Sequence, residues 1–325
     1  DGRHVLVSTS GGWQLLDAAT WTQGHGDHNH YYTADPVLHD LVVPAETPGH
    51  VVVNDGLTAL FDDGTGQVTV FAADGWTEAA AHGAAQAVRS LTTTAHHGVA
   101  VAWQDGTLLT TLDGPSGRIG AQILGADDAE LGSSNVCPGV HGETVVDQST
   151  AVLGCEDGVI IKHGHHFHKM AAPDNYGRIG NLFSVTGSDT VLGDYKTDPD
   201  GRLSQIALVD TAAEALQVVE VATNYTFRGL ARGIDGEVLV LGTDGNLQIR
   251  DQDSGELIRS VSVISPWELP DQWQSPQPAL IVLDGMAYVT EPATQQIHVV
   301  DYAGGEVWRT FDLPQIPNEI VGVTG

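Results

Sequence analysis

A short segment that recurs at nearly constant spacing is the feature that most constrains the fold of this chain. Each copy is an alternating apolar run that ends in a tight turn, as in GHVVVNDG at 49–56 and AHHGVAVAWQDG at 95–106, with a weaker copy, VHGETVVDQS, at 140–149. The turns that end such runs stand at seven places: Asp1, Asp55, Asp105, Gln148, Ser188, Asp235 and Asp284. Their spacings, 54, 50, 43, 40, 47 and 49 residues, are close to the length of a four-stranded propeller blade.

The spacing predicts an all-β protein that forms a single β-propeller domain over residues 1–325. We count seven four-stranded blades, and an eighth is possible because the chain opens on Asp1 without an initiator methionine and we expect it to have been processed or trimmed. Eleven Asp-Gly dipeptides serve as hairpin signals. The first unit is expected to supply three outer strands near 3–8, 13–17 and 37–43. A C-terminal strand at 318–325 is expected to pair with 3–8 and close the ring, which would remove two open sheet edges.

Two segments depart from this pattern of strands and tight turns. The Ala-rich stretch 78–88 is the only convincing helical candidate, and it is short. The stretch 266–278, PWELPDQWQSPQP, holds four prolines and two tryptophans and is typical of an ordered surface loop that crosses between blades.

The charge of the chain restricts its partners. The formal charge is −29, from 42 acidic and 13 basic residues, and such a surface repels phosphate backbones and anionic lipid. No apolar run approaches the roughly 20 residues that are needed to cross a bilayer. We therefore expect neither a nucleic-acid partner nor membrane insertion, and we expect a monomer.

The two cysteines, Cys137 and Cys155, are placed so that they could meet. If 140–146 and 151–156 form a hairpin, Cys155 returns beside the residues that precede the first strand. A disulfide is then geometrically reasonable and would imply an oxidising compartment. The alternative is a pair of buried free thiols.

Fifteen histidines in a chain with few other cations are a strong bias, and three groups of them stand out. The first group is in HGDHNHYY at 25–32, which we interpret as a long loop between outer strands. Its candidate ligands are His25, Asp27, His28 and His30, because three imidazoles and a carboxylate within six residues can bind zinc. The alternative is a polar loop whose histidines contact only solvent.

The second group stands at matching positions of successive inner strands and comprises His50, His96 or His97, and His141. Because side chains alternate along a strand, only one of His96 and His97 can point inward, and we favour His97. Three neutral imidazoles leave a fourth zinc position for water, a carboxylate such as Glu143, or an incoming ligand. The alternative is that these histidines satisfy backbone carbonyls.

The third group lies in KHGHHFHK at 162–169, a predicted hairpin between outer strands of the fourth unit. Such histidine-rich tracts bind zinc, nickel or copper loosely. The candidate ligands of this capture loop are His163, His165, His166 and His168. The alternative is a variable surface hairpin.

The motifs of common catalysis are missing from the sequence. It contains no HExxH, GxSxG, GxxxxGK[ST] or GxGxxG. Arg178 and Arg228 stand at the entrances of the fifth and sixth units, so one rival hypothesis is a metal-dependent propeller lyase or hydrolase whose arginines clamp an anionic substrate. Another is a propeller scaffold for protein partners in which the histidines are incidental.

Several short motifs together resemble the AztD family of periplasmic zinc metallochaperones. They occur in order within the first 180 residues: HGDH at 25–28, PGHVV at 48–52, HHGVAV at 96–101, CPGVHGE at 137–143 followed by Cys155, and GRIG at 177–180. His30 and KHGHHFHK are departures from the shared pattern.

The resemblance implies a periplasmic, secreted or cell-surface β-propeller that binds zinc tightly. Such a protein passes zinc to the solute-binding protein of a zinc ABC importer and is not an enzyme. The family's metal-binding histidines would carry over to His25, His28, His96 or His97, and His141, with His50 a further candidate. We therefore predict a non-catalytic zinc metallochaperone that acts in metal transport and zinc homeostasis.

Overall fold

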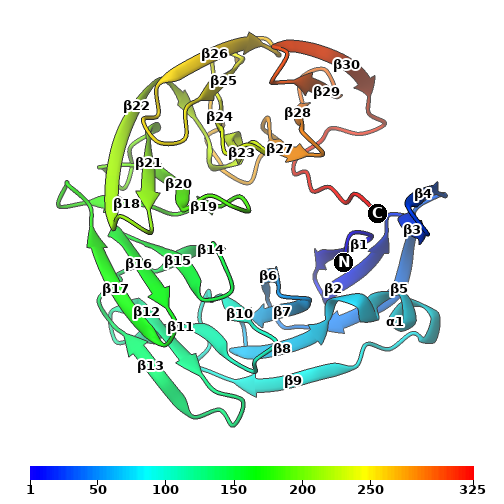
Figure 1. Ribbon diagram of the computed structural model, residues 1–325, viewed down its shortest axis with the longest axis vertical. Coiled ribbons are helices and arrows are strands. Elements are labelled where there is room, and N and C mark those ends of the chain that lie inside the picture. The colour runs from blue at the N-terminus through cyan, green and yellow to red at the C-terminus, as the bar shows by residue number, and fades with distance from the viewer. The chain divides into compact units, whose positions relative to one another are not determined.

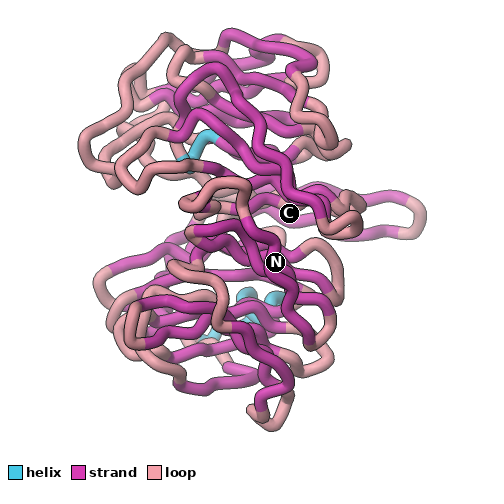
Figure 2. The backbone as a smooth tube through the Cα atoms, turned by 90° about the vertical axis from the view of Figure 1, so that its left-hand side faces the viewer, coloured by secondary structure: helices cyan, strands magenta, loops and turns pink.

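The fold class predicted from the sequence, an all-β propeller of seven blades, is confirmed. The computed structural model describes residues 1–325 and contains seven blade sheets of antiparallel strands, with very little helix (Figures 1 and 2). The chain comprises two compact units. The first consists of residues 1–140, 164–167 and 323–325, and the second of residues 141–163 and 168–322.

The first unit holds three blade sheets, in each of which consecutive strands pair. The first sheet has three strands, as the sequence predicted: β1 (His4–Thr9), β2 (Gly12–Asp17) and β5 (Val37–Pro44). The second comprises β6 (Pro48–Asn54), β7 (Leu57–Asp62), β8 (Gln67–Ala72) and β9 (Ala87–Thr92). The third comprises β10 (Ala100–Ala102), β11 (Leu108–Gly114), β12 (Gly117–Leu124) and β13 (Glu130–Ser134). A separate hairpin is made by β3 (Thr20–His25) and β4 (His28–Thr33).

The other four sheets follow the same order of strands. One contains β14 (His141–Val145), β15 (Thr150–Cys155), β16 (Asp157–His163) and β17 (His166–Ala171), with the short β18 (Gly177–Arg178) beside β16. The next contains β19 (Leu182–Phe183), β20 (Thr190–Tyr195), β21 (Leu203–Asp210) and β22 (Ala215–Tyr225). Then come β23 (Leu230–Arg232), β24 (Val238–Leu241), β25 (Asn246–Arg250) and β26 (Leu257–Ser262). The last sheet contains β27 (Leu280–Leu283), β28 (Met286–Glu291), β29 (Gln296–Asp301) and β30 (Glu306–Asp312).

The core lies between the faces of neighbouring sheets within each unit. In the first unit, Phe61 and Val70 of one sheet pack with Ala102 and Leu108 of the next. Middle strands are covered on both faces, so all six residues of β15 are buried, whereas all seven residues of the outer strand β30 are exposed. Burying a Leu or Phe side chain contributes about 1.5–3 kcal/mol, which makes this stacking the main stabilising interaction.

Two Asp-Gly dipeptides form the tight hairpin turns that the sequence predicts. Asp55 and Gly56 have φ of 48° and 71°, and Asp284 and Gly285 have φ of 49° and 73°. Two consecutive left-handed residues make a type I′ turn, whose twist matches that of the flanking strands. These turns set the register that pairs Asn54 with Leu57 in the β6–β7 hairpin.

Two predicted elements differ from the structure. The helix α1 spans Trp76–His82 instead of 78–88, because Gly83 adopts a left-handed φ of 69° and ends it, after which β9 begins at Ala87. The predicted C-terminal strand does not form. The only ladder-like contact is the Gly325 N–H, which donates to the Gly2 carbonyl at 2.7 Å.

The residues that should have started this C-terminal strand have other partners. The backbone carbonyl of Asn318 and the carboxylate of Glu319 accept hydrogen bonds from the Arg228 guanidinium at 3.1 and 2.9 Å. Pro317, directly before them, has no N–H for a sheet ladder. The segment therefore stays irregular.

Candidate metal centres

The first histidine group lies on a regular hairpin and not in the loop that we expected. Strands β3 and β4 pair from Thr20–Thr33 to His25–His28 around the two-residue turn Gly26-Asp27. Trp21 and Tyr32 stack across the strands with ring centroids 5.3 Å apart. Trp21 and Thr22 in one arm and Tyr31 and Tyr32 in the other are residues that favour strands.

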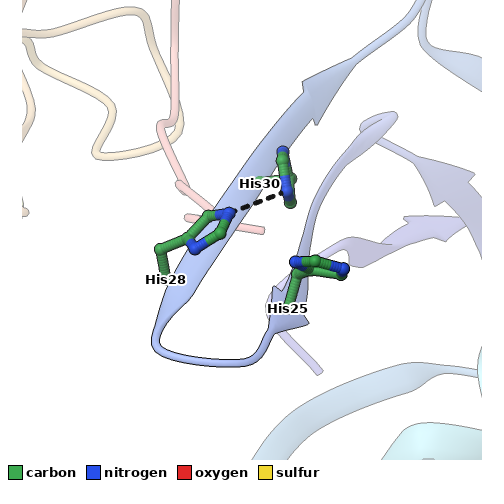
Figure 3. Close-up of side chains that lie close together, drawn as sticks. All are labelled: His25, His28 and His30. Atoms are coloured by element: carbon green, nitrogen blue, oxygen red, sulfur yellow. Dashed lines mark hydrogen bonds between the residues drawn. The ribbon is translucent and has the colours of Figure 1, made fainter.

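The hairpin brings its three histidines together at its tip. His28 and His30 lie two residues apart on one face of β4, and His25 is the cross-strand partner of His28 (Figure 3). The His28 and His30 Nε2 atoms are 3.2 Å apart, and one nitrogen from each of the three residues lies within 4.8 Å of the others. We call these three residues the hairpin cluster.

Asp27, the fourth predicted ligand of this group, supports a histidine instead of joining the cluster. Its Oδ1 accepts a hydrogen bond from His28 Nδ1 at 3.1 Å, and this bond lowers the pKa of the Asp27 carboxyl. The contact assigns Nε2 of His28 as the nitrogen that a metal would use. Asp27 is fully exposed and all three histidines are exposed, so the hairpin cluster is open to solvent.

The second histidine group also comes together. His50 lies on β6, His97 precedes β10, and His141 opens β14. In the first unit, the His50 and His97 rings are 5.1 Å apart, and His141, at the start of the second unit, is grouped with them as a candidate metal ligand. We call His50, His97 and His141 the framework cluster.

Fixed acceptors orient two of the framework histidines. The Asp63 carboxylate accepts from His97 Nδ1 at 2.5 Å and also from the Gly98 N–H at 3.2 Å. The Gly180 carbonyl accepts from His141 Nδ1 at 2.7 Å. Hydrogen bonds of this kind fix the tautomer and ring orientation of a metal-binding histidine and assign its other nitrogen to the metal.

His96 and His97, the two alternatives of the sequence analysis, differ in their partners. His96 directs Nδ1 to the Thr94 carbonyl at 2.7 Å and Nε2 to the Thr111 hydroxyl at 2.8 Å, so both of its nitrogens are engaged. Its ring also packs edge-on against Phe61. His96 is therefore left out of the framework cluster, because hydrogen bonds within the chain engage both of its ring nitrogens.

Two supporting carboxylates escaped the sequence analysis. One is Asp63, the second aspartate of an Asp-Asp-Gly turn. The other is Asp194, whose buried carboxylate accepts from the backbone N–H groups of Gly180 and Asn181 at 2.5 and 3.0 Å. Burial raises the pKa of Asp194, and these hydrogen bonds act against that rise. Asp194 thereby holds the Gly180 peptide whose carbonyl orients His141.

The third histidine group forms the predicted hairpin but no cluster. His163 ends β16 and His166 begins β17, so the turn is tight. His163 Nδ1 contacts the Thr150 hydroxyl at 3.1 Å, and His168 Nε2 lies 3.5 Å from the Glu214 carboxylate. None of the four predicted ligands, His163, His165, His166 and His168, belongs to a group of three converging side chains.

The two arginines of the rival enzyme hypothesis have partners within the chain. The buried Arg228 guanidinium is held by Asn318 and Glu319, as described above, and its side chain also lies over the Phe227 ring. Arg178 Nη1 lies 3.9 Å from the Glu156 carboxylate.

The predicted disulfide is confirmed. Cys137 and Cys155 are both disulfide-bonded and fully buried, and no free cysteine is left. The structure also contains no helix with the length and apolar character that crossing a bilayer requires.

Comparisons with known proteins agree with this picture. No family model matches the sequence. The zinc chaperone AztD of Citrobacter koseri is 26% identical over 313 residues, which are 93% of this chain and 71% of that protein. A crystal structure of Citrobacter koseri AztD gives a TM-score of 0.81 at 23% identity and covers 97% of this chain and 84% of that one.

More distant structures share the fold only. BamB from Moraxella catarrhalis gives a TM-score of 0.56 at 12% identity and covers 95% of this chain and 84% of that one. The resemblance predicted from the sequence motifs is confirmed: over nearly its whole length, this chain is similar to the zinc chaperone AztD.

Proposed function

We propose that this protein is a zinc metallochaperone, without catalytic activity, that hands zinc to the solute-binding protein of a zinc ABC importer. The observation that carries the proposal is the presence of two candidate sets of three histidines, one of which brings its nitrogens within 4.8 Å of one another on a single exposed hairpin. The similarity to a protein named as a zinc chaperone supports zinc as the cargo. The disulfide supports a periplasmic or secreted location, where disulfides persist.

The chemistry of the two clusters suits zinc. Three imidazoles with Zn–N bonds of about 2.1 Å leave the fourth tetrahedral position open, and the nitrogens in such a site are about 3.4 Å apart. Small side-chain rotations would bring nitrogens within 4.8 Å to that spacing. The open position lets a ligand of the receiving protein bind zinc before the last histidine of this protein leaves it.

We propose different roles for the two clusters. The framework cluster holds zinc tightly, because Asp63 and the Gly180 carbonyl orient two of its imidazoles before the metal arrives. The hairpin cluster passes zinc on, because its ligands are exposed and an acceptor can reach them. The hydrogen bond that orients His28 from outside the cluster comes from Asp27, which is itself exposed.

The proposal is tested with zinc-loaded protein and the apo form of a zinc solute-binding protein. Transfer is followed in the presence of a chelator that traps released zinc. We expect transfer to proceed without trapping for the parent protein and for the control His82→Ala, which removes an exposed histidine at the end of α1. A chaperone role would be contradicted if the chelator trapped all the zinc, at the rate at which zinc dissociates spontaneously from the loaded protein.

A further inference from the structure

A pocket that has no histidine lies in the second unit, between the proline-rich loop 263–279 and the turn after β28. Its volume is about 340 Å³, which suits a ligand of the size of a single amino-acid side chain or a small metabolite. The zinc proposal gives this pocket no task. The sequence analysis singled out the same loop for its prolines and tryptophans.

The walls of the pocket offer few hydrogen-bond donors. Four prolines line it, Pro266, Pro276, Pro278 and Pro292, and proline has no backbone N–H. The Trp267 donors are used elsewhere, since its backbone N–H donates to the Thr243 carbonyl at 2.9 Å and its indole N–H to the Gly242 carbonyl at 3.1 Å. No Lys, Arg or His side chain lines the pocket.

Acceptors are present in the same pocket. Gln277 is only 2% exposed, and its Nε2 donates to the Trp273 carbonyl at 2.7 Å. Its Oε1 is buried and has no hydrogen-bond partner. A buried amide oxygen without a partner is costly, and Gln277 is one of the residues that line the pocket, so a ligand that donates to this oxygen would remove that cost.

Two carboxylates add negative charge to the lining. Glu291 is buried, and its Oε2 accepts from the Thr294 hydroxyl at 2.7 Å and contacts His298 Nε2 at 3.1 Å. Its Oε1 takes only a long bond of 3.4 Å from the Ser265 N–H. Glu268 lines the pocket from an exposed position.

We propose that this pocket binds a small organic cation, an alkylammonium or guanidinium group on a short apolar stem. Such a group donates without accepting, which matches an acceptor-rich and donor-poor lining. The proline rings and Trp267 would contact the stem, and an aromatic ring next to a cation adds attraction. The net charge of −29 favours cations and opposes an anionic ligand.

The experiment measures binding of n-butylammonium by calorimetry, with n-butanol as the neutral ligand of equal stem, butyrate as the anion and Ca²⁺ as an inorganic cation. We expect n-butylammonium to bind at least about tenfold more tightly than n-butanol, and butyrate and Ca²⁺ not to compete. Glu268→Gln should weaken binding about threefold and Gln277→Leu about tenfold, because each removes an acceptor or a charge. The exposed Glu306→Gln on β30 is the matched control and should change nothing.

A second arm identifies the source of the cation. The probe is lysine acetylated at its α-amine and amidated at its carboxyl, so that only the side-chain ammonium carries charge. It will bind more tightly than n-butylammonium if the natural ligand is a side chain of a protein, and no more tightly if the natural ligand is a free amine. The proposal would be overturned if n-butanol and n-butylammonium bound with equal affinity, or if Ca²⁺ competed with n-butylammonium. It would also be overturned if Glu268→Gln and Gln277→Leu left the affinity for n-butylammonium unchanged. Zinc affinity measured on the same variants separates this result from any failure of the chaperone proposal.

Discussion

The hairpin cluster and the framework cluster each offer three histidine ligands, and they differ in how these side chains are held. The hairpin cluster takes all its histidines from positions 25–30 of one exposed hairpin. The framework cluster takes them from positions 50, 97 and 141, and two of the three rings are fixed by Asp63 and by the Gly180 carbonyl. Under the roles proposed above, orientation by surrounding groups, and not ligand identity, would distinguish a site that holds a metal from a site that exchanges it.

Removing framework ligands should have the largest effect. We expect His97→Ala combined with His141→Ala to weaken the tightest zinc affinity by at least about 100-fold, because two of three nitrogens are lost. The matched triple variant His25→Ala, His28→Ala and His30→Ala should retain that affinity and instead slow transfer to the acceptor. Competition with a chelator and stopped-flow transfer measure the two quantities, and a reversal of the two phenotypes would contradict the assignment of roles.

Acidification should separate zinc release from unfolding. An imidazole must be neutral to bind zinc, so affinity falls steeply below about pH 6.5. Competitive zinc titration and circular dichroism on the same samples at pH 7.5 and 5.5 should show lost affinity with an unchanged fold. Equal zinc affinity at both values would exclude histidine as the main ligand.

The fold should persist to lower pH because its paired carboxylates have depressed pKa values. The hydrogen bond from Arg3 lowers the pKa of Asp17 below 3.8. Burial acts to raise the pKa of Asp62, but hydrogen bonds from the Glu46 and Thr47 backbones, and further bonds from the same turn, outweigh it. A folded-state pKa below the unfolded value contributes stability that is present above about pH 4 and is lost as pH falls through the folded pKa. Acid unfolding should therefore begin below about pH 4.

A matched pair of supporting carboxylates sharpens the comparison further. Asp63→Asn should weaken zinc affinity about tenfold, because its carboxylate orients His97 and is only 15% exposed. Asp27→Asn, at the fully exposed partner of His28, should change affinity by less than about twofold. Chelator competition on both variants, with circular dichroism to check folding, measures the difference. Equal effects would show that burial of the supporting group is irrelevant.

Asp194→Asn probes the same idea one step further from the metal. Asp194 Oδ1 accepts from the Gly180 and Asn181 N–H groups and Oδ2 accepts from Asn181 Nδ2, and an Asn amide keeps only one of these two acceptor oxygens. One side of this arrangement would then place an N–H group against a donor, so the Gly180 carbonyl that orients His141 should move. We expect zinc affinity to fall about three- to tenfold with little change in secondary structure. Unchanged affinity would assign Asp194 a purely structural role.

The smallest effect should come from the third histidine group. Replacing His165, His166 and His168 with Asn should leave the tight affinity within about twofold, since these residues join no group of three converging ligands. Metal analysis should show a loss of weakly held zinc only. A large loss of tight binding would place a site in the β16–β17 hairpin.

Much of this architecture follows from local sequence. The Asp-Gly turns and the recurring alternating runs predicted the blades, because turn chemistry and strand period are local properties. The juxtaposition of His50 and His97 followed from their equivalent positions in successive repeats. The segment 25–32 was taken for a loop, and the structure shows that it forms the end of the hairpin at 20–33.

Other features depend on contacts distant in sequence. The prediction of a C-terminal strand was wrong because Asn318 and Glu319 bind Arg228, which is about ninety residues away in the sequence. The role of Asp194 depends on the backbone of Gly180 and Asn181, which no spacing rule identifies. Likewise, the pairing of Asp63 with His97 requires the turn after β7 to meet the segment before β10.

The most direct test of the account is diffraction at the zinc absorption edge from crystals of the zinc-loaded protein. At one equivalent of zinc, the account predicts one anomalous peak bound by nitrogens of His50, His97 and His141, with the hairpin cluster filling only when more zinc is added. A first peak at His25, His28 and His30, or a zinc ion that no two framework histidines share, would contradict it.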